Sequence, residues 1–262
     1  MTMTPLDTAH AEMEAQPNID TFRLQFYERL ADSELFLLLE EEPTEDMAKP
    51  MLFPVEDQQF ALVFDSEERL VEFAQQSAPF VSLSGRLVVQ MLNGQNIGLG
   101  VNLSVAPSSM LLPSEAVEWL AETLLIEPEQ AQAKPVAIYA PKSIPEVLIA
   151  SLDTKLAAMA GVAKAAYLAE VEYEDAPRGH VIAFVEAIEA AQPAITSAVA
   201  EALTFSGIEA GTLDVLFLRT TDPIYALLSK VALRFDLPEL LEPKAQVMEA
   251  PGSDPDKPPK LH

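Results

Sequence analysis

The feature that most constrains the fold is a repeated change of hydrophobic period along the chain. Short continuous apolar runs, such as Leu35–Leu39, alternate with stretches whose apolar residues recur every four positions, such as Phe22, Phe26 and Leu30. The first pattern is typical of a buried strand and the second of an amphipathic helix. Both patterns occur on either side of residue 130, so we expect strands and helices to be mixed in both halves.

A polar stretch between Glu127 and Pro135 separates these halves; it is bounded by prolines and lacks periodicity, which is typical of a domain boundary. Periodicity is also missing at the two ends, and from Pro238 onward prolines are interspersed with charged residues. We therefore divide the chain into a disordered leader (1–18), an N-terminal domain (19–127), a linker (128–134), a C-terminal domain (135–237) and a disordered proline-rich tail (238–262).

Each half contains the signature of a β-hairpin. In the first, the apolar runs 51–55 and 60–64 flank a polar turn, and in the second the runs 162–173 and 180–185 flank another. Because helical patterns surround both hairpins, the sequence predicts an α+β fold. We expect two mixed domains, each a largely antiparallel sheet with helices packed on it.

The charge of the chain excludes several classes of partner. Its 41 acidic and 16 basic residues leave a formal net charge of −25, whereas 49% of the residues are hydrophobic, which is enough for a packed core. A binder of nucleic acid or of anionic membranes needs a basic face, so we expect neither partner. No signal peptide and no apolar run long enough to span a bilayer is evident, which favours a cytoplasmic protein.

Signatures of catalysis are missing as well. The chain has no cysteine, and two of its three histidines, His10 and His262, fall in the expected tails. His180 could act as a general base, but no nucleophile is spaced to join it, so a surface position is the alternative we favour. Gly98-Leu-Gly100 could be a phosphate loop, but no third glycine and helix follow it. We therefore expect no catalytic residues, no metal and no cofactor.

Two groups of residues remain as candidates for an interaction surface. The acidic run after the first strand could bind Ca²⁺ or a basic protein, or it could simply be solvated. The single tryptophan could anchor an interface or lie in the core. The candidate surface consists of Glu40, Glu41, Glu42, Glu45, Asp46 and Trp119.

A third acidic group lies on one expected strand. Glu170, Glu172 and Glu174 alternate with Val171 and Tyr173, which places the carboxylates on one face. Such carboxylates could share a proton for acid–base chemistry. The alternative, which we favour, is the solvent-facing side of an antiparallel hairpin.

Several phrases of the sequence resemble the SseB family, named for enhanced serine sensitivity. In the first half these are Leu35–Leu39, Ala61–Ser66 followed by Glu67–Leu70, and Gly98–Asn102, although Asn102-Leu103 replaces the usual Asn-Pro. In the second half, Ser143–Glu146 and Val162–Leu168 resemble the family's C-terminal domain. The resemblance implies a two-domain cytosolic protein of unsettled activity, non-enzymatic, with no catalytic residues to carry over.

These observations lead to a hypothesis of binding rather than catalysis. We expect a protein–protein interaction or metabolic regulatory protein, and residues 19–127, with 19 acidic and 5 basic residues, would meet a basic partner first. The alternative is an amino-acid sensor with its site between the domains. A hydrolase using clustered acidic residues is a third possibility. The identity of the partner and the oligomeric state are left open by the sequence.

Overall fold

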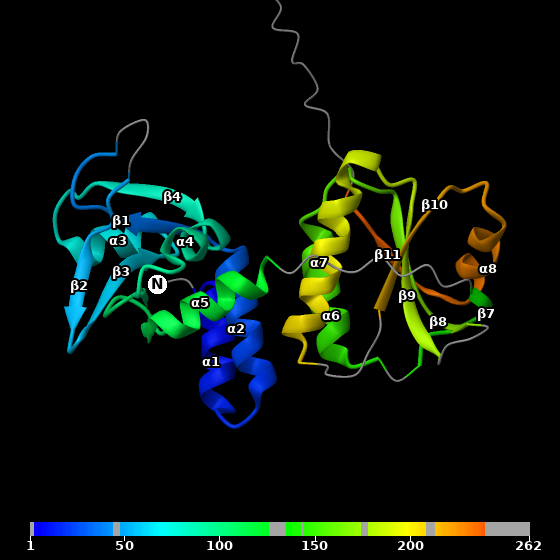
Figure 1. Cartoon of the computed structure of the whole chain (residues 1–262), viewed down its shortest axis with the longest axis horizontal. Coiled ribbons are helices and arrows are strands. Elements are labelled where there is room, and N and C mark those ends of the chain that lie inside the picture. Colours follow the sequence, from blue (N-terminus) through cyan, green and yellow to red (C-terminus); the bar gives the residue numbers. More distant parts are fainter. Residues whose placement is uncertain are drawn as a thin grey trace, which may run out of the picture.

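The computed structural model describes residues 3–43, 48–125, 135–142, 144–173, 178–207 and 213–238. Within these ranges the chain forms two α+β units, which lie side by side with helices of the first facing helices of the second (Figure 1). Each unit has one mixed sheet with helices on it, so the predicted fold class is confirmed.

The first unit contains five helices and six strands in the described ranges. They are α1 (Pro5–Ala15), α2 (Asp20–Asp32), β1 (Glu34–Leu38), β2 (Leu52–Val55), β3 (Gln58–Phe64), α3 (Glu67–Ala74), β4 (Phe80–Ser84), α4 (Gly85–Leu92), β5 (Ile97–Val101), β6 (Met110–Leu112) and α5 (Ser114–Thr123).

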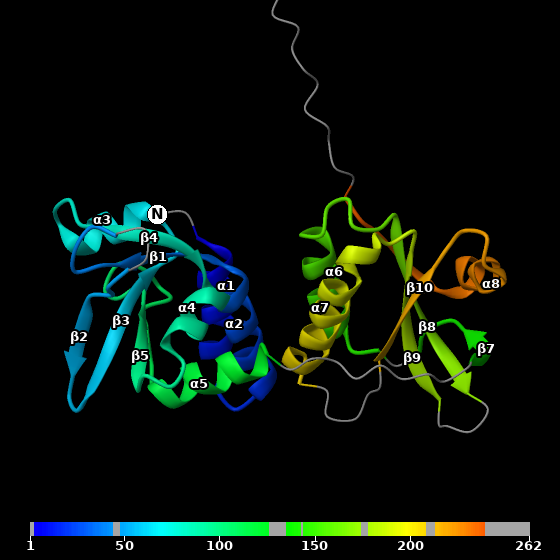
Figure 2. The same ribbon diagram turned by 45° about the horizontal axis from the view of Figure 1, so that its top comes forward.

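The strands of this unit form a sheet of order β4-β1-β3-β5-β6, and β2 also pairs with β3. Alternation along the strands sends side chains to two layers. On one face, Leu37 and Val63 pack with Phe26 of α2 and Val88 of α4. On the other face, a smaller cluster forms around Leu70 of α3. Figure 2 shows α1, α2, α4 and α5 gathered on the side of the sheet that faces the second unit.

The expectation of a disordered leader over residues 1–18 is wrong. Residues Pro5–Ala15 form α1, which a capping box at Thr4 begins. Leu6 and Met13 are buried in the main core, and Asp7 is fully buried. The helix was missed because its apolar residues are few and its stability depends on tertiary contacts, as is common for short helices.

The second unit contains three α-helices, a short 3₁₀ segment and five strands in the described ranges. They are β7 (Pro135–Tyr139), α6 (Glu146–Ala157), β8 (Ala165–Tyr173), β9 (Gly179–Val185), η1 (Glu189–Ala191), α7 (Gln192–Phe205), β10 (Leu213–Leu218), α8 (Pro223–Val231) and β11 (Leu233–Asp236).

The second sheet has the order β10-β9-β8-β11, with β7 also paired to β8. Leu152 of α6 and Val199 of α7 pack on one face with Leu168 and Phe184, whereas Leu228 of α8 packs on the other. Both sheets are largely antiparallel as predicted, and the exceptions are the parallel pairs β3–β5 and β9–β10. Of the predicted tail, 238–262, only Pro238 is described, and its carbonyl accepts from the N–H of Gly161. The predicted linker, 128–134, lies outside the described residues.

No helix in the described part of the chain is both long enough and apolar enough to cross a membrane.

Candidate functional site

The two units meet through an aromatic contact that belongs to the core of the first. Phe205, the last residue of α7, is fully buried in the cluster formed by α1, α2, α4 and α5. Its ring lies 6.4 Å from that of Trp119, which in turn lies 5.6 Å from that of Tyr27 on α2. Because a side chain of one unit completes the core of the other, their relative position is defined by packing.

Next to this contact, Lys155 of α6 binds three carboxylates. Its Nζ lies 2.9 Å from Asp32 Oδ2, 3.1 Å from Glu201 Oε2 and 3.3 Å from Glu28 Oε1. Asp32 and Glu28 come from α2, so the lysine joins the two units directly. The Ser151 hydroxyl also donates to Glu28 Oε1, at 2.7 Å. The lysine side chain is 7% exposed, so water and salt screen these interactions less than those of a surface pair.

Arg86 of α4 joins the same cluster from the first unit. Its guanidinium donates to both oxygens of Glu201, at 2.7 and 2.9 Å, and to Asp32 Oδ1 at 3.0 Å. A bidentate pair of this kind defines orientation as well as distance. Two cations and three carboxylates therefore connect α2 and α4 with α6 and α7, and we call Glu28, Asp32, Arg86, Lys155 and Glu201 the interdomain ion cluster.

Burial shifts the pKa values within this cluster. Burial raises the pKa of Glu28, although Lys155 and Ser151 act in the opposite direction. Burial lowers the pKa of Lys155, but Asp32 and Glu28 outweigh this effect and leave the pKa above its ordinary value. The lysine therefore stays charged at neutral pH, and Glu28 protonates more readily than an ordinary glutamate.

A cleft of about 550 Å³ opens beside the interdomain ion cluster. Its wall includes charges of both signs together with small apolar side chains from α6 and α7. The lining residues are Arg29, Asp32, Arg86, Thr154, Lys155, Ala158, Met159, Ala194, Ser197, Ala198 and Glu201. Among the described residues, no carboxylate lies within ion-pair distance of Arg29, so its charge is available to a ligand.

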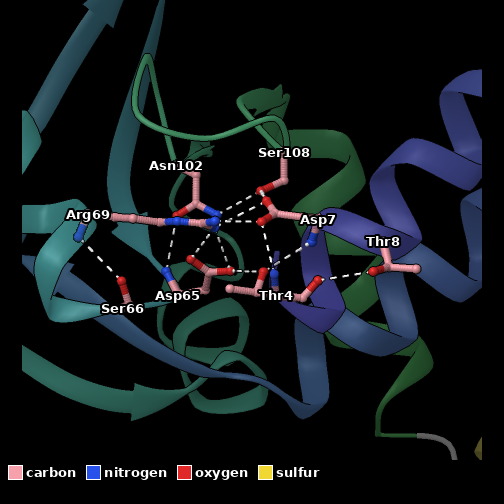
Figure 3. A network of polar contacts seen from close by, with 8 residues as sticks. All are labelled: Thr4, Asp7, Thr8, Asp65, Ser66, Arg69, Asn102 and Ser108. Carbon is pink, nitrogen blue, oxygen red and sulfur yellow. Dashed lines mark hydrogen bonds and ion pairs between the residues drawn. The ribbon is translucent and has the colours of Figure 1, made fainter. Parts of the chain in front are cut away.

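A second polar cluster lies inside the first unit (Figure 3). Arg69 of α3 donates to Asp7 Oδ1 at 3.1 Å, and to the two oxygens of Asp65 at 2.7 and 2.9 Å. The Ser108 hydroxyl donates to Asp7 Oδ1, and Asn102 donates to Ser108. This cluster attaches α1 to β3, α3 and the loop after β5.

The pKa of Asp7 shows how strongly that cluster holds its charge. Burial raises this pKa, but hydrogen bonds from Arg69, Ser108 and Thr4 outweigh burial and lower the pKa well below its usual range. No buried polar side-chain atom in the described ranges lacks a partner. We therefore assign the Arg69 cluster to the stability of the first unit.

The acidic run predicted as an interaction surface is only partly described. Glu40, Glu41 and Glu42 are exposed, and Glu40 forms an ion pair with Lys49. Glu45 and Asp46 lie outside the described residues. No group of three or more His, Asp or Glu that could hold a metal ion is found in the described part of the chain.

Trp119 is neither wholly in the core nor free. Its side chain is 39% exposed, while its ring contacts Tyr27 and Phe205. Trp119 therefore belongs to the contact between the units, and we do not group it with Glu40–Glu42 in one surface.

The other candidates have structural roles. His180 lies on β9, where its Nε2 is 3.2 Å from the carbonyl of Lys142. Glu172 accepts from Arg178 at 2.8 Å and from Tyr139 at 3.1 Å, and Glu170 is the partner of Arg178 at 3.5 Å, whereas Glu174 lies outside the described residues. These carboxylates form surface ion pairs on the hairpin.

Gly98 belongs to β5 rather than to a phosphate loop. A Cβ at this position would lie 2.5 Å from the ring of Phe60 and 2.6 Å from the carbonyl oxygen of Leu112. The glycine is therefore required because a neighbouring ring and strand approach it closely.

The sequence did not indicate the residues of the interdomain ion cluster. Asp32, Arg86 and Glu201 each occupy a helix position that is typical of a solvated charge. The one available signal was Lys155 together with Ser151, since both fall on the apolar side of α6 with Leu148 and Leu152.

Comparison with known proteins identifies part of the chain. Residues 6–119 match the family model of the SseB protein N-terminal domain, and the match includes α1 and ends at Trp119. The chain has no significant match among curated proteins or among solved structures.

Proposed function

Since residues 6–119 form an SseB protein N-terminal domain, we propose that the chain is a non-enzymatic regulatory protein of the cytoplasm, linked to serine sensitivity. It acts by binding a small zwitterionic molecule, such as an amino acid, in the cleft between its two units. The observation that carries this proposal is the lining of that cleft, which combines Arg29 with the carboxylates of Asp32 and Glu201.

A zwitterion suits this lining better than an ion of one sign. A carboxylate would pair with Arg29, whose charge no described carboxylate meets, and an ammonium group would find Asp32 and Glu201 on the same wall. The lining carries three cations and two carboxylates, so a ligand with two negative charges would exceed its single excess positive charge. The apolar remainder would lie against Ala158 and Ala198. A volume of about 550 Å³ lies within the range of small-molecule sites.

The packing around Phe205 supports a preformed site. Because this ring is fully buried in the core of the first unit, the two walls of the cleft are held in place before a ligand arrives. Binding then avoids the free-energy cost of ordering the site.

Calorimetric titration with an amino-acid panel that includes serine tests the proposal. Each amino acid is compared with the amine that lacks its carboxylate and the hydroxy acid that lacks its ammonium group. We expect binding only when both charges are present, and loss of binding in Arg29→Ala. The matched control is Arg23→Ala, because Arg23 lies on the same helix but is exposed and pairs with Asp20. Absence of binding at millimolar ligand would exclude the proposal.

A protein partner is the second candidate function. It is supported by the acidity of the N-terminal half, which favours fast encounter with a basic surface. Affinity purification from native lysate should recover a specific protein at low salt and less of it at high salt. Recovery of chaperones alone at both salt concentrations would count against this candidate.

A further inference from the structure

The hairpin formed by β2 and β3 exposes an unusual run of apolar residues. Met51, Leu52 and Phe53 are consecutive, and each is between 36% and 45% exposed. Neighbouring residues of a strand point to opposite faces, so the exposure of both Leu52 and Phe53 means that neither face is fully covered here by described residues. In both views the hairpin extends away from the helices of its unit (Figures 1 and 2). Continuous exposed apolar surface of this kind marks interaction sites.

The hairpin is held in a defined position at its base. Phe53 is the antiparallel partner of Phe60, and Phe60 is buried against Gly98 of β5. Pro54 follows on the same strand and has no N–H to donate, which prevents an incoming strand from pairing continuously along β2. Recognition at this edge would therefore depend on side chains.

Exposed carboxylates lie at both ends of the apolar run. Glu56 and Asp57 form the turn of the hairpin. At the other end, the N–H of Met51 donates to the carbonyl of Leu38 and the N–H of Glu40 to that of Lys49, which brings the exposed segment Glu40–Glu42 beside the start of β2. Lys49, the described cation of this region, is already paired with Glu40.

We infer that this surface, made of Met51–Phe53 and the carboxylates at its two ends, docks a basic amphipathic segment of another protein. The inference rests on the second candidate function and names its site. Charge complementarity selects the occupant, because lysine or arginine flanking an apolar anchor would meet carboxylates at both ends. A second copy of the chain would bring the same carboxylates against each other, and each copy carries a net charge of −25.

Fluorescence anisotropy with a short labelled peptide, in which lysine alternates with leucine, tests the inference at physiological ionic strength. The double variant Leu52→Ser/Phe53→Ser should weaken binding by about tenfold or more, since two apolar anchors are lost. Replacing Glu40–Glu42 by glutamine should weaken binding and reduce its dependence on salt. Leu227→Ser is the matched control, because Leu227 is an exposed leucine on α8 of the second unit. Circular dichroism and thermal unfolding establish that each variant is folded.

Equal affinity of the double variant and the unaltered chain would overturn the inference, as would failure of the unaltered chain to bind the peptide. Recovery of the native partner distinguishes the two proposals. If the double variant still recovers that partner from lysate, the second candidate function is supported, but the proposed docking surface is wrong. Sedimentation provides the remaining outcome, since a dimer of the unaltered chain that becomes monomeric in the double variant would assign the surface to self-association.

Discussion

Phe205 of α7 packs edge-to-face against Trp119 of α5, with ring centroids 6.4 Å apart, although the two residues belong to different units. Edge-to-face pairs of this kind contribute about 0.5–1.5 kcal/mol beyond the burial of their surface. The match to the SseB N-terminal domain ends at residue 119, so its last matched residue lies at the contact between the units. The domain therefore has part of its core supplied by a segment outside the family match.

Replacing Phe205 by alanine should lower the free energy of unfolding by about 3–5 kcal/mol, because a fully buried ring leaves a cavity. Trp119 is the only tryptophan, so its emission should move to longer wavelength as water reaches its ring. Phe217→Ala, which alters the core of the second unit alone, is the control and should leave the native emission unchanged. A normal Trp119 spectrum in Phe205→Ala would contradict the packing described here.

A double-mutant cycle on Arg86 and Glu201 should reveal a coupling free energy of about 1–2 kcal/mol in chemical denaturation. The pair is bidentate, and the glutamate side chain is only 10% exposed. The comparison pair is Arg178 and Glu172, which are both exposed and should couple by less than about 1 kcal/mol. Equal coupling free energies in the two cycles would show that the Arg86–Glu201 pair between the units is no stronger than an exposed surface ion pair.

Lys155→Met should destabilise the fold by about 3–5 kcal/mol at pH 7, because three carboxylates would lose their shared cation. Burial already raises the pKa of Glu28 above its ordinary value of 4.5, and loss of the lysine would raise it further. The folded variant then binds more protons than the unfolded chain, so its stability should increase as the pH falls from 7 toward 5. Urea unfolding at several pH values measures the stability of the variant. If its free energy of unfolding decreased from pH 7 to pH 5 relative to that of the unaltered chain, the prediction would be wrong.

Asp7→Asn should lower the free energy of unfolding by about 3 kcal/mol at pH 7, because Arg69 loses one of its two buried carboxylate partners. The folded pKa of Asp7 lies below its ordinary value of 3.8, so its ionisation stabilises the fold fully above about pH 5. That contribution is lost as the pH falls through 4 and below. The difference in the free energy of unfolding between Asp7→Asn and the unaltered chain should therefore narrow as the pH falls, which unfolding curves at acidic pH measure. A constant difference down to pH 3 would contradict a stabilising role for the ionised Asp7.

Gly98→Ala should lower stability by about 1–3 kcal/mol, because the new Cβ would collide with the ring of Phe60 and the carbonyl oxygen of Leu112. Thermal unfolding measures the change. Gly94→Asn is the comparison, since Gly94 has a positive φ that asparagine tolerates and nothing lies within 4 Å of its would-be Cβ. A harmless Gly98→Ala would reopen the possibility that this glycine serves a ligand.

The hairpins were predictable because their information is local. The runs 51–55 and 60–64 become β2 and β3, and Glu56 and Asp57 form the turn between them. Residues 5–15 carry too little of such a pattern, and the contact that anchors their helix joins Asp7 to Arg69, 62 positions away. Sequence patterning detects a helix by its apolar stripe, whereas α1 also depends on a buried ion pair.

The sequence by itself determined the two mixed units, most of their helices and strands, and the acidity of the N-terminal half, because hydrophobic period and charge are properties of neighbouring residues. Only the tertiary structure decided which charged side chains come together to form a site. Lys155 and Asp32 are 123 positions apart, and Arg86 and Glu201 are 115 apart, yet they form one cluster beside the cleft. In the sequence Asp32, Arg86 and Glu201 are indistinguishable from solvated surface charges, since burial and a partner of opposite sign are supplied by packing between distant segments.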